Sequence, residues 1–181
     1  MKKIKQLGFA LTMVLTLVLS SCSSDSDSNS GGGSGPAGLG TLRATIGGSS
    51  FSSISQASMA MLASNGAFQN LSISGADLTG RTLQIMILGE NIGVGTYAIS
   101  ETSEMPSTAV YSEVDISNPS AGAQSWGAPY DGGGNSGSVV ITSMTATNVQ
   151  GTFSFTALNV TGSSGTKAVT NGAFNINITA N

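Results

Sequence analysis

The sequence predicts an all-β domain, an antiparallel meander that closes into a β-sandwich or a barrel. Three observations lead to this prediction. From residue 41 onward, apolar and polar residues alternate with a period of two, the spacing of a strand that buries one face. Turn-forming residues interrupt these runs, and the 181-residue chain has 25 glycines. Apart from one ambiguous stretch, residues 55–64, no segment has the 3.6-residue period of an amphipathic helix.

The first 21 residues have the pattern of a signal peptide. Lys2, Lys3 and Lys5 precede an uncharged apolar run over residues 7–19. A run of about 13 residues has the length of a secretory h-region, and it is shorter than the roughly 20 residues that span a membrane. We therefore expect residues 1–21 to be removed from the mature protein.

The signal is followed by a short motif that ends in the chain's single cysteine, Leu19-Ser20-Ser21-Cys22. It resembles the lipobox of bacterial lipoproteins, with leucine three residues before the cysteine and small residues between. The resemblance implies cleavage before Cys22, a diacylglycerol on its thiol and an acylated amine. Several acyl chains would anchor the protein, because each buried CH₂ contributes about 0.8 kcal/mol. The alternative is a secreted protein cut at a nearby small residue, with Cys22 lost or left free.

Residues 22–40 are predicted to be the lipidated cysteine and a flexible Gly/Ser linker. This composition cannot bury enough apolar surface to fold, and its root-mean-square reach is about 20–25 Å. Asp25 and Asp27 resemble the acidic signal that displays Bacteroidota lipoproteins on the cell surface. We expect a lipid-anchored outer-membrane protein, on the cell surface rather than the periplasmic face. The alternative is that the two aspartates only keep the linker soluble.

Residues 41–181 are the predicted folded domain. Residues 42–46 alternate, and residues 83–88 are apolar on both faces, as in a central strand. In residues 149–157 and 172–179 the large apolar side chains share one face. Glycine pairs and Asn-Gly separate the runs, which gives roughly nine to eleven strands.

Two segments of this domain are ambiguous. Residues 55–64 fit either a short helix or a strand in which the methionines alternate. Residues 117–135 contain Pro119, Pro129 and several glycines, so we expect mainly a long loop.

Four short motifs resemble an uncharacterised family of Bacteroidota lipoproteins. They are ATIGG at 44–48, GTYAI at 95–99, NVQGTFSF at 148–155 and VTNGAF at 169–174. The family shares a Gly-Thr-Tyr strand start, a Gly-Thr-Phe-Ser-Phe strand and a closing Gly-x-Phe strand. The resemblance covers residues 41–179. It implies an all-β domain with no assigned activity and transfers no catalytic residue.

The composition excludes several classes of function. Charged residues make up 8% of the chain, against about 25% in an ordinary domain. Without residues 1–21 the chain keeps three basic and nine acidic residues, a net charge of −6, so we expect no nucleic-acid partner. The absence of histidine excludes an imidazole-based triad or metal site. We expect no cofactor and no metal, and residues 131–135, a weak calcium candidate, fit a Gly-rich turn better.

Glu113 and Asp115 are the candidates for a catalytic carboxylate pair. At strand spacing they share a face with Tyr111 and lie roughly 6–7 Å apart, which could suit a glycosidase. Val110, Val114 and Ile116 occupy the opposite face of the strand, which would then face the core. We therefore expect Tyr111, Glu113 and Asp115 on the solvated face, with no catalytic role.

Trp126 is the chain's single tryptophan, and Tyr130 follows it in the predicted Pro/Gly loop. Exposed aromatic side chains on loops can stack on sugar rings, so Trp126 and Tyr130 are the candidate ligand-binding residues. The alternative is that Trp126 folds back and plugs one end of the core. We expect Phe153, Phe155 and Phe174 in that core.

These features together favour a non-enzymatic, lipid-anchored binding or presentation module. Its partners would be the membrane, through the lipid on Cys22, and a glycan, a peptide or an envelope protein as ligand. Two alternatives stay open. One is a carboxylate-dependent glycan hydrolase that uses Glu113 and Asp115, and the other is a passive structural envelope protein.

Overall fold

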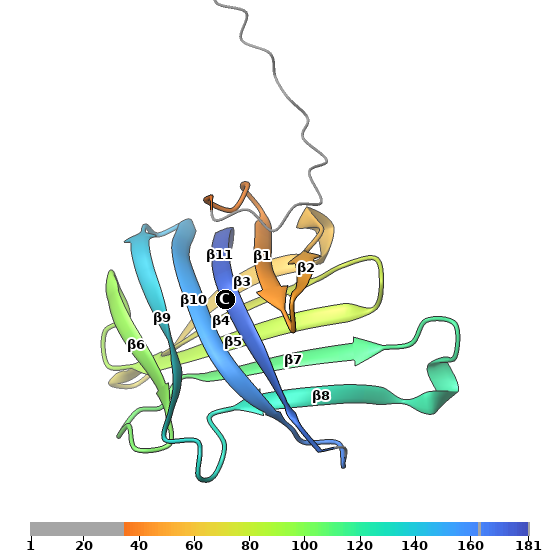
Figure 1. Ribbon diagram of the computed structural model, residues 1–181. Helices are drawn as coiled ribbons and strands as arrows, with labels where there is room; N and C mark the ends of the chain where they lie inside the picture. Colours follow the sequence, from red (N-terminus) through yellow and green to blue (C-terminus); the bar gives the residue numbers. More distant parts are fainter. Residues whose placement is uncertain (1–34, 163, 181) are drawn as a thin grey trace, which may run out of the picture.

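The computed structural model describes residues 35–162 and 164–180. The predictions for the signal peptide, Cys22, Asp25 and Asp27 concern residues outside these ranges. Within them the chain is nearly all β, which confirms the predicted fold class (Figure 1). There is no helix in the described residues with the length and apolar character needed to cross a membrane.

The described residues form eleven strands and two short 3₁₀ helices. In chain order these are β1(Thr41–Ile46), β2(Ser49–Ser52), η1(Ser55–Ala57), β3(Ser58–Asn65), β4(Phe68–Ala76), β5(Arg81–Gly89), β6(Gly95–Ser100), β7(Thr108–Val114), η2(Pro119–Ala121), β8(Ala123–Ala128), β9(Asn135–Met144), β10(Asn148–Asn159) and β11(Thr166–Ala180).

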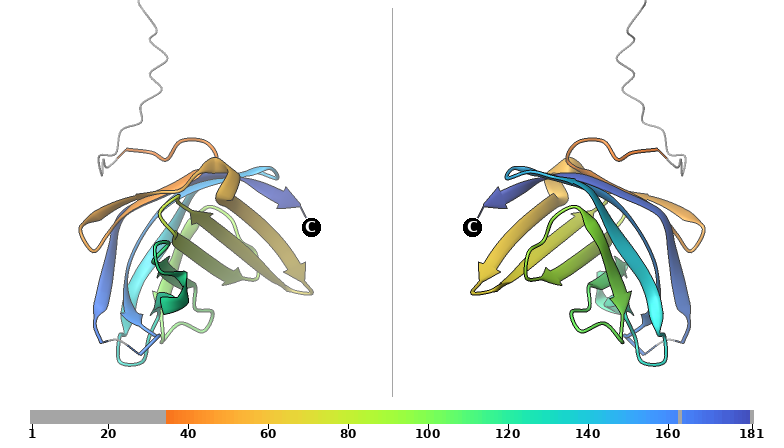
Figure 2. Two further views of the ribbon diagram at one scale, coloured as in Figure 1. Left: turned by 90° about the vertical axis from the view of Figure 1, so that its right-hand side faces the viewer. Right: turned by 90° about the vertical axis from the view of Figure 1, so that its left-hand side faces the viewer.

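All eleven strands belong to one sheet, in the order β2-β1-β11-β3-β4-β5-β7-β8-β10-β9-β6. β11 also pairs with β10, so the seven strands from β11 through β3 to β10 form a closed ring of hydrogen-bonded neighbours. β1 and β2 extend the sheet beyond β11, and β9 and β6 extend it beyond β10. Figure 2 shows the sheet folded over, with β9, β10 and β11 in one wall and β3, β4 and β5 in the other. The chain is therefore a barrel with two flanking extensions.

The sheet departs from a simple antiparallel meander wherever strands that are distant in the chain pair with each other. β11 and β3 pair in parallel, through three residue pairs that begin at Ile178 and Ala60. β6 leaves its chain neighbours β5 and β7 and pairs with β9 instead. The other pairings are antiparallel, as predicted.

The core fills the space inside the folded sheet. Along β10 every second residue is buried, which is the pattern expected for a strand with one solvated face. Phe153 stacks on Phe155 and on Phe174 of β11, with ring centroids 6.2 and 6.3 Å apart. The predicted place of these three phenylalanines in the core is confirmed.

Three segments clarify or correct the predictions. Residues 55–64 form the turn η1 and then most of β3, so the strand alternative holds for most of this stretch. The loop predicted for residues 117–135 is wrong for β8, which pairs along its whole length with β7. Residues 35–40, at the end of the predicted linker, precede β1 without forming a strand, but the Ala37 side chain is buried.

The close approach of β10 to its neighbours predicts an intolerance to a larger residue at Gly151. A Cβ atom there would lie 2.5 Å from Cζ of Phe174 and would also meet the Val140 carbonyl oxygen. We expect Gly151→Ala to lower the free energy of unfolding by about 1–3 kcal/mol, because the backbone carbonyl cannot move aside. Urea unfolding measures the loss.

Gly93→Ala is the matched control, since a Cβ atom at Gly93 would meet nothing within 4 Å. Its stability should stay within about 0.5 kcal/mol of the wild type. Equal stability of the two variants would contradict the packing described for β10.

Candidate functional site

The structure places Trp126 on β8 rather than in a loop. Its side chain is 6% exposed, and its ring lies 5.6 Å from the Tyr111 ring, centroid to centroid. This burial agrees with the alternative in which Trp126 closes one end of the core. Tyr130 lies in the turn after β8 and is half-buried, beside Gly133. Because removal of a buried tryptophan costs about 3–5 kcal/mol, a binding role must be tested at exposed residues instead.

A cluster of four side chains, which we call the Lys167 cluster, joins β7, β8 and β11. It consists of Tyr111, Glu113, Trp126 and Lys167. The Lys167 ammonium donates to both carboxylate oxygens of Glu113, at 2.8 and 2.9 Å, and the Tyr111 hydroxyl donates to Oε2 at 2.8 Å. The ammonium also lies 3.9 Å from the centre of the Trp126 ring and 5.1 Å from that of Tyr111. Both aromatic faces therefore stabilise the cation that neutralises Glu113.

This arrangement corrects the predicted orientation of β7. Tyr111 is 2% exposed, whereas Val110 is 38% exposed, so the two faces of the strand are reversed. The reason lies in the register, because Tyr111 is paired with Leu83 of β5 and Trp126 of β8, both buried. A tyrosine can occupy an interior position because its hydroxyl finds Glu113 near the strand end.

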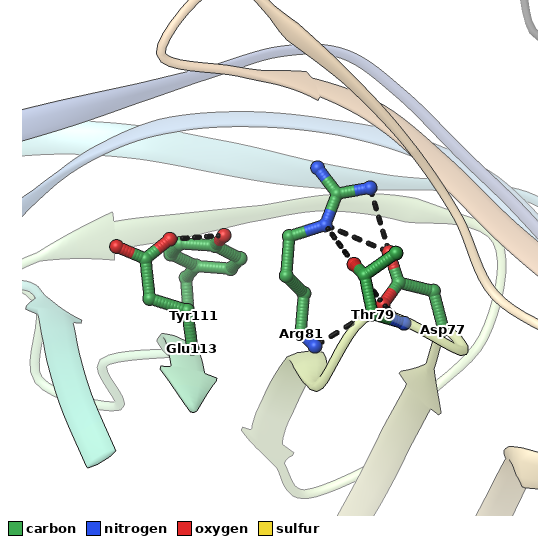
Figure 3. Close-up of polar contacts among 5 residues, drawn as sticks. All are labelled: Asp77, Thr79, Arg81, Tyr111 and Glu113. Carbon is green, nitrogen blue, oxygen red and sulfur yellow. Dashed lines mark hydrogen bonds and ion pairs between the residues drawn. The ribbon is translucent and has the colours of Figure 1, made fainter. Parts of the chain in front are cut away.

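A second polar group lies nearby, in the turn between β4 and β5. Asp77 accepts hydrogen bonds from the backbone N–H and hydroxyl of Thr79, both at 2.8 Å, and from Nε of Arg81 at 2.7 Å. The Arg81 guanidinium also forms an ion pair with Asp77 at 2.6 Å and lies over the Phe51 ring. Figure 3 shows this turn beside Tyr111 and Glu113. Each of these charges is held in place by its own partners.

Glu113 and Asp115 both line one depression of about 450 Å³. Its other lining residues are Thr79, Arg81, Val114, Ala121, Gly122 and Gln124. Asp115 follows the end of β7, where it accepts hydrogen bonds from the Ser117 hydroxyl at 2.5 Å and the Ser117 N–H at 2.9 Å. The two predicted carboxylates therefore line the same depression, Glu113 near the end of β7 and Asp115 in the turn that follows it.

Both carboxyl groups are acidic for their type. Partial burial raises the pKa of Glu113, but the hydrogen bonds from Lys167 and Tyr111 outweigh it and leave the pKa below its ordinary value. The hydrogen bonds from Ser117 lower the pKa of Asp115. A glycosidase acid needs a raised pKa, so neither group is tuned to donate a proton at neutral pH. The depression therefore presents ionised, fixed acceptors.

The described residues contain no group of three or more His, Cys, Asp or Glu side chains that could hold a metal ion. The loop that follows β8 contains Gly132 and Gly134. Their N–H groups donate hydrogen bonds, each at 3.1 Å, to the carboxylate of Glu101, which follows β6. Both glycines have positive φ, as in the predicted Gly-rich turn.

Comparison with known proteins gives a family and no function. A family model described as Domain of unknown function (DUF6252) matches residues 41–176. No curated protein and no solved structure matches the chain.

The Lys167 cluster predicts how stability depends on pH. The pKa of Glu113 is lowered in the folded state, so the carboxylate stabilises the fold above its ordinary pKa of 4.5. This contribution is lost as the pH falls through the folded-state pKa. We expect the stability advantage of the wild type over Glu113→Gln, measured by urea unfolding, to shrink as the pH falls from about 5 to about 3.

Glu90→Gln, which removes an exposed carboxylate at the end of β5, is the control. It shows how the loss of an exposed carboxylate affects the same unfolding measurement. A Glu113→Gln difference that is constant with pH would contradict the assigned hydrogen bonds to Lys167 and Tyr111.

Proposed function

We propose that this chain, which belongs to the DUF6252 family of unknown function, is a lipid-anchored lipoprotein of a Bacteroidota outer membrane. Its β-barrel domain would bind a ligand without catalysing a reaction. The lipobox motif that ends at Cys22 and the Gly/Ser linker support the anchor. Asp25 and Asp27 support display on the cell surface.

The observation that carries the binding proposal is the depression beside Glu113. Its volume of about 450 Å³ is within the range of small-molecule sites, roughly 300–1,000 Å³. Asp77 fixes Arg81 at its wall, and Lys167 and Tyr111 fix Glu113, so its polar groups are oriented before any ligand arrives. Preorganised groups lose less conformational entropy on binding.

The chemistry of this depression suits a neutral glycan. Arg81 and Glu113 line the depression, and a guanidinium and a carboxylate can each form more hydrogen bonds than their ion pairs use. Gln124 and Asp115 add a donor and acceptors to the lining. Sugar hydroxyls can both donate and accept, which matches this mixture. A ligand with a net charge would have to compete with the existing ion pairs.

The alternative of a glycan hydrolase has one observation in its favour, since Glu113 and Asp115 line the same depression. Their lowered pKa values oppose the general-acid role. The binding proposal is therefore preferred, and a hydrolytic assay is included in its test.

An array of neutral glycans tests the binding proposal. We expect capture by the wild type and a loss of about tenfold for Gln124→Ala, the size of one hydrogen bond to a ligand. Gln84→Ala is the matched control, because Gln84 is an exposed glutamine on β5 that does not line this depression. Equal binding by both variants, or no capture at all, would contradict the proposed site. Release of sugar products that stops in Glu113→Gln would establish the hydrolase.

Protease treatment of intact cells tests the anchor and its membrane face. We expect an external protease to degrade the wild-type domain on intact cells and to spare any Cys22→Ala protein that stays with the cells. Degradation only after lysis would place the domain on the periplasmic face. A Cys22→Ala protein that remains attached to the membrane would contradict the lipid anchor.

A further inference from the structure

We infer that the outer face of β1, β9, β10 and β11 carries a second binding site, centred on Arg43, for an acidic saccharide. The site is separate from the depression beside Glu113 and goes beyond the function proposed there. Figure 1 shows the four strands side by side. Three observations carry the inference: a cation that has no partner among the residues the structure describes, a depression lined by hydroxyl groups, and an irregularity of β11 at the same place.

Arg43 differs from the other basic residues of the described chain. Arg81 and Lys167 form ion pairs with Asp77 and Glu113, at 2.6 and 2.8 Å. Arg43 has no ion pair or hydrogen bond from its side chain within residues 35–162 and 164–180, and its Nε atom is buried without a hydrogen-bond partner. Because Nε is enclosed, a ligand would reach the guanidinium through its terminal nitrogens, which also have no acceptor within residues 35–162 and 164–180.

Arg43 lines an open depression of about 460 Å³. Hydroxyl and amide side chains surround it, contributed by three strands: Ser138 of β9, Thr152 and Ser154 of β10, and Thr170 and Asn171 of β11. No acidic residue is among the lining residues. An anionic group could therefore approach the guanidinium without local repulsion.

A bulge in β11 gathers two of these side chains on one face. β11 has one residue more than either neighbour at this point, since Arg43 and Thr45 pair with Ala173 and Thr170. β10 shows the same shift between Phe153 and Phe155. Successive residues of a regular strand face opposite ways, but Thr170 and Asn171 are both exposed and both line the depression.

Asn171, at the centre of the bulge, has φ of 52°, the one non-glycine residue with positive φ in the described chain. This conformation is uncommon for residues with a Cβ atom. Bulges occur next to functional sites, where they re-aim a side chain. The backbone irregularity and the Arg43 side chain therefore coincide in one depression.

The lining chemistry selects the ligand class. A guanidinium binds a carboxylate through two parallel hydrogen bonds, a geometry that an ammonium cannot match. The surrounding hydroxyl and amide groups can pair with sugar hydroxyls, which donate and accept. A uronic-acid saccharide carries both features, and the volume suits one of a few rings.

Calorimetric titration with trigalacturonic acid tests the inference, using the protein purified in detergent from its own cells. The methyl-esterified trisaccharide is the matched probe, because it keeps the sugar hydroxyls and lacks the charge. We expect the wild type to bind the acid at least tenfold more tightly than the ester. Arg43→Gln should lose this preference, and Arg43→Lys should keep part of it. Equal affinity for acid and ester, or no binding of the acid, would overturn the inference.

Two further variants separate binding from folding and from the first site. Asn171→Gly removes the side-chain amide and suits positive φ, so we expect weaker binding with an unchanged or higher Tm. Gln124→Ala should bind the acid like the wild type, whatever the result of the neutral-glycan array. Undiminished binding by both Arg43→Gln and Asn171→Gly would show that the acid binds elsewhere. A loss of binding in Gln124→Ala equal to that in Arg43→Gln would also contradict a separate site.

Discussion

The ladder between β10 and β11 is the interaction on which the rest of the structure depends. It is the longest strand pairing in the described chain, and it carries the stacked phenylalanines of the core. Each of the two strands also pairs with another strand at its end: β11 pairs with β3, and β10 pairs with β8. These two junctions join the walls into a ring. Gly151 and Gly172 lie within the ladder, where a side chain would collide with Phe174 or Phe153. The absence of a Cβ atom there is therefore a condition for closing the barrel.

One ion pair of this domain lies where the backbone contributes few hydrogen bonds. β8 and β10 share only two residue pairs, which makes this the shortest junction of the ring. Lys167, at the start of β11, reaches Glu113 on β7 and the ring of Trp126 on β8, so side chains connect the strands beside that junction. Because the pair is partly shielded and contacts two aromatic rings, it is expected to contribute more than an exposed surface pair. Arg43 stands outside this pattern, which is why its surroundings are informative.

The sequence was sufficient for the strands with regular alternation and insufficient where contacts between distant residues decide the outcome. Alternation in β10 and β11 correctly placed Phe153, Phe155 and Phe174 inside. β8 was missed because Pro119 and the glycines around it hide a six-residue strand whose partners lie elsewhere in the chain. The prediction of the buried face of β7 is wrong because it rests on hydrophobicity, and a valine side chain is more apolar than a tyrosine side chain. Tyr111 is acceptable inside only because Glu113 bonds its hydroxyl, and Glu113 depends on a lysine 54 residues away.

The position of β11 also affects the order in which the molecule can form. β1 is the first strand of the described chain. It pairs with β2 on one side and with β11, the last strand, on the other. β3 and β10 also pair with β11. Contacts so distant in sequence form slowly, because the entropy of closing the intervening loop is lost before the contacts can compensate for it. The barrel can therefore close only after its final strand is present. Until β11 is present, β1, β3 and β10 each lack one of their ladder partners.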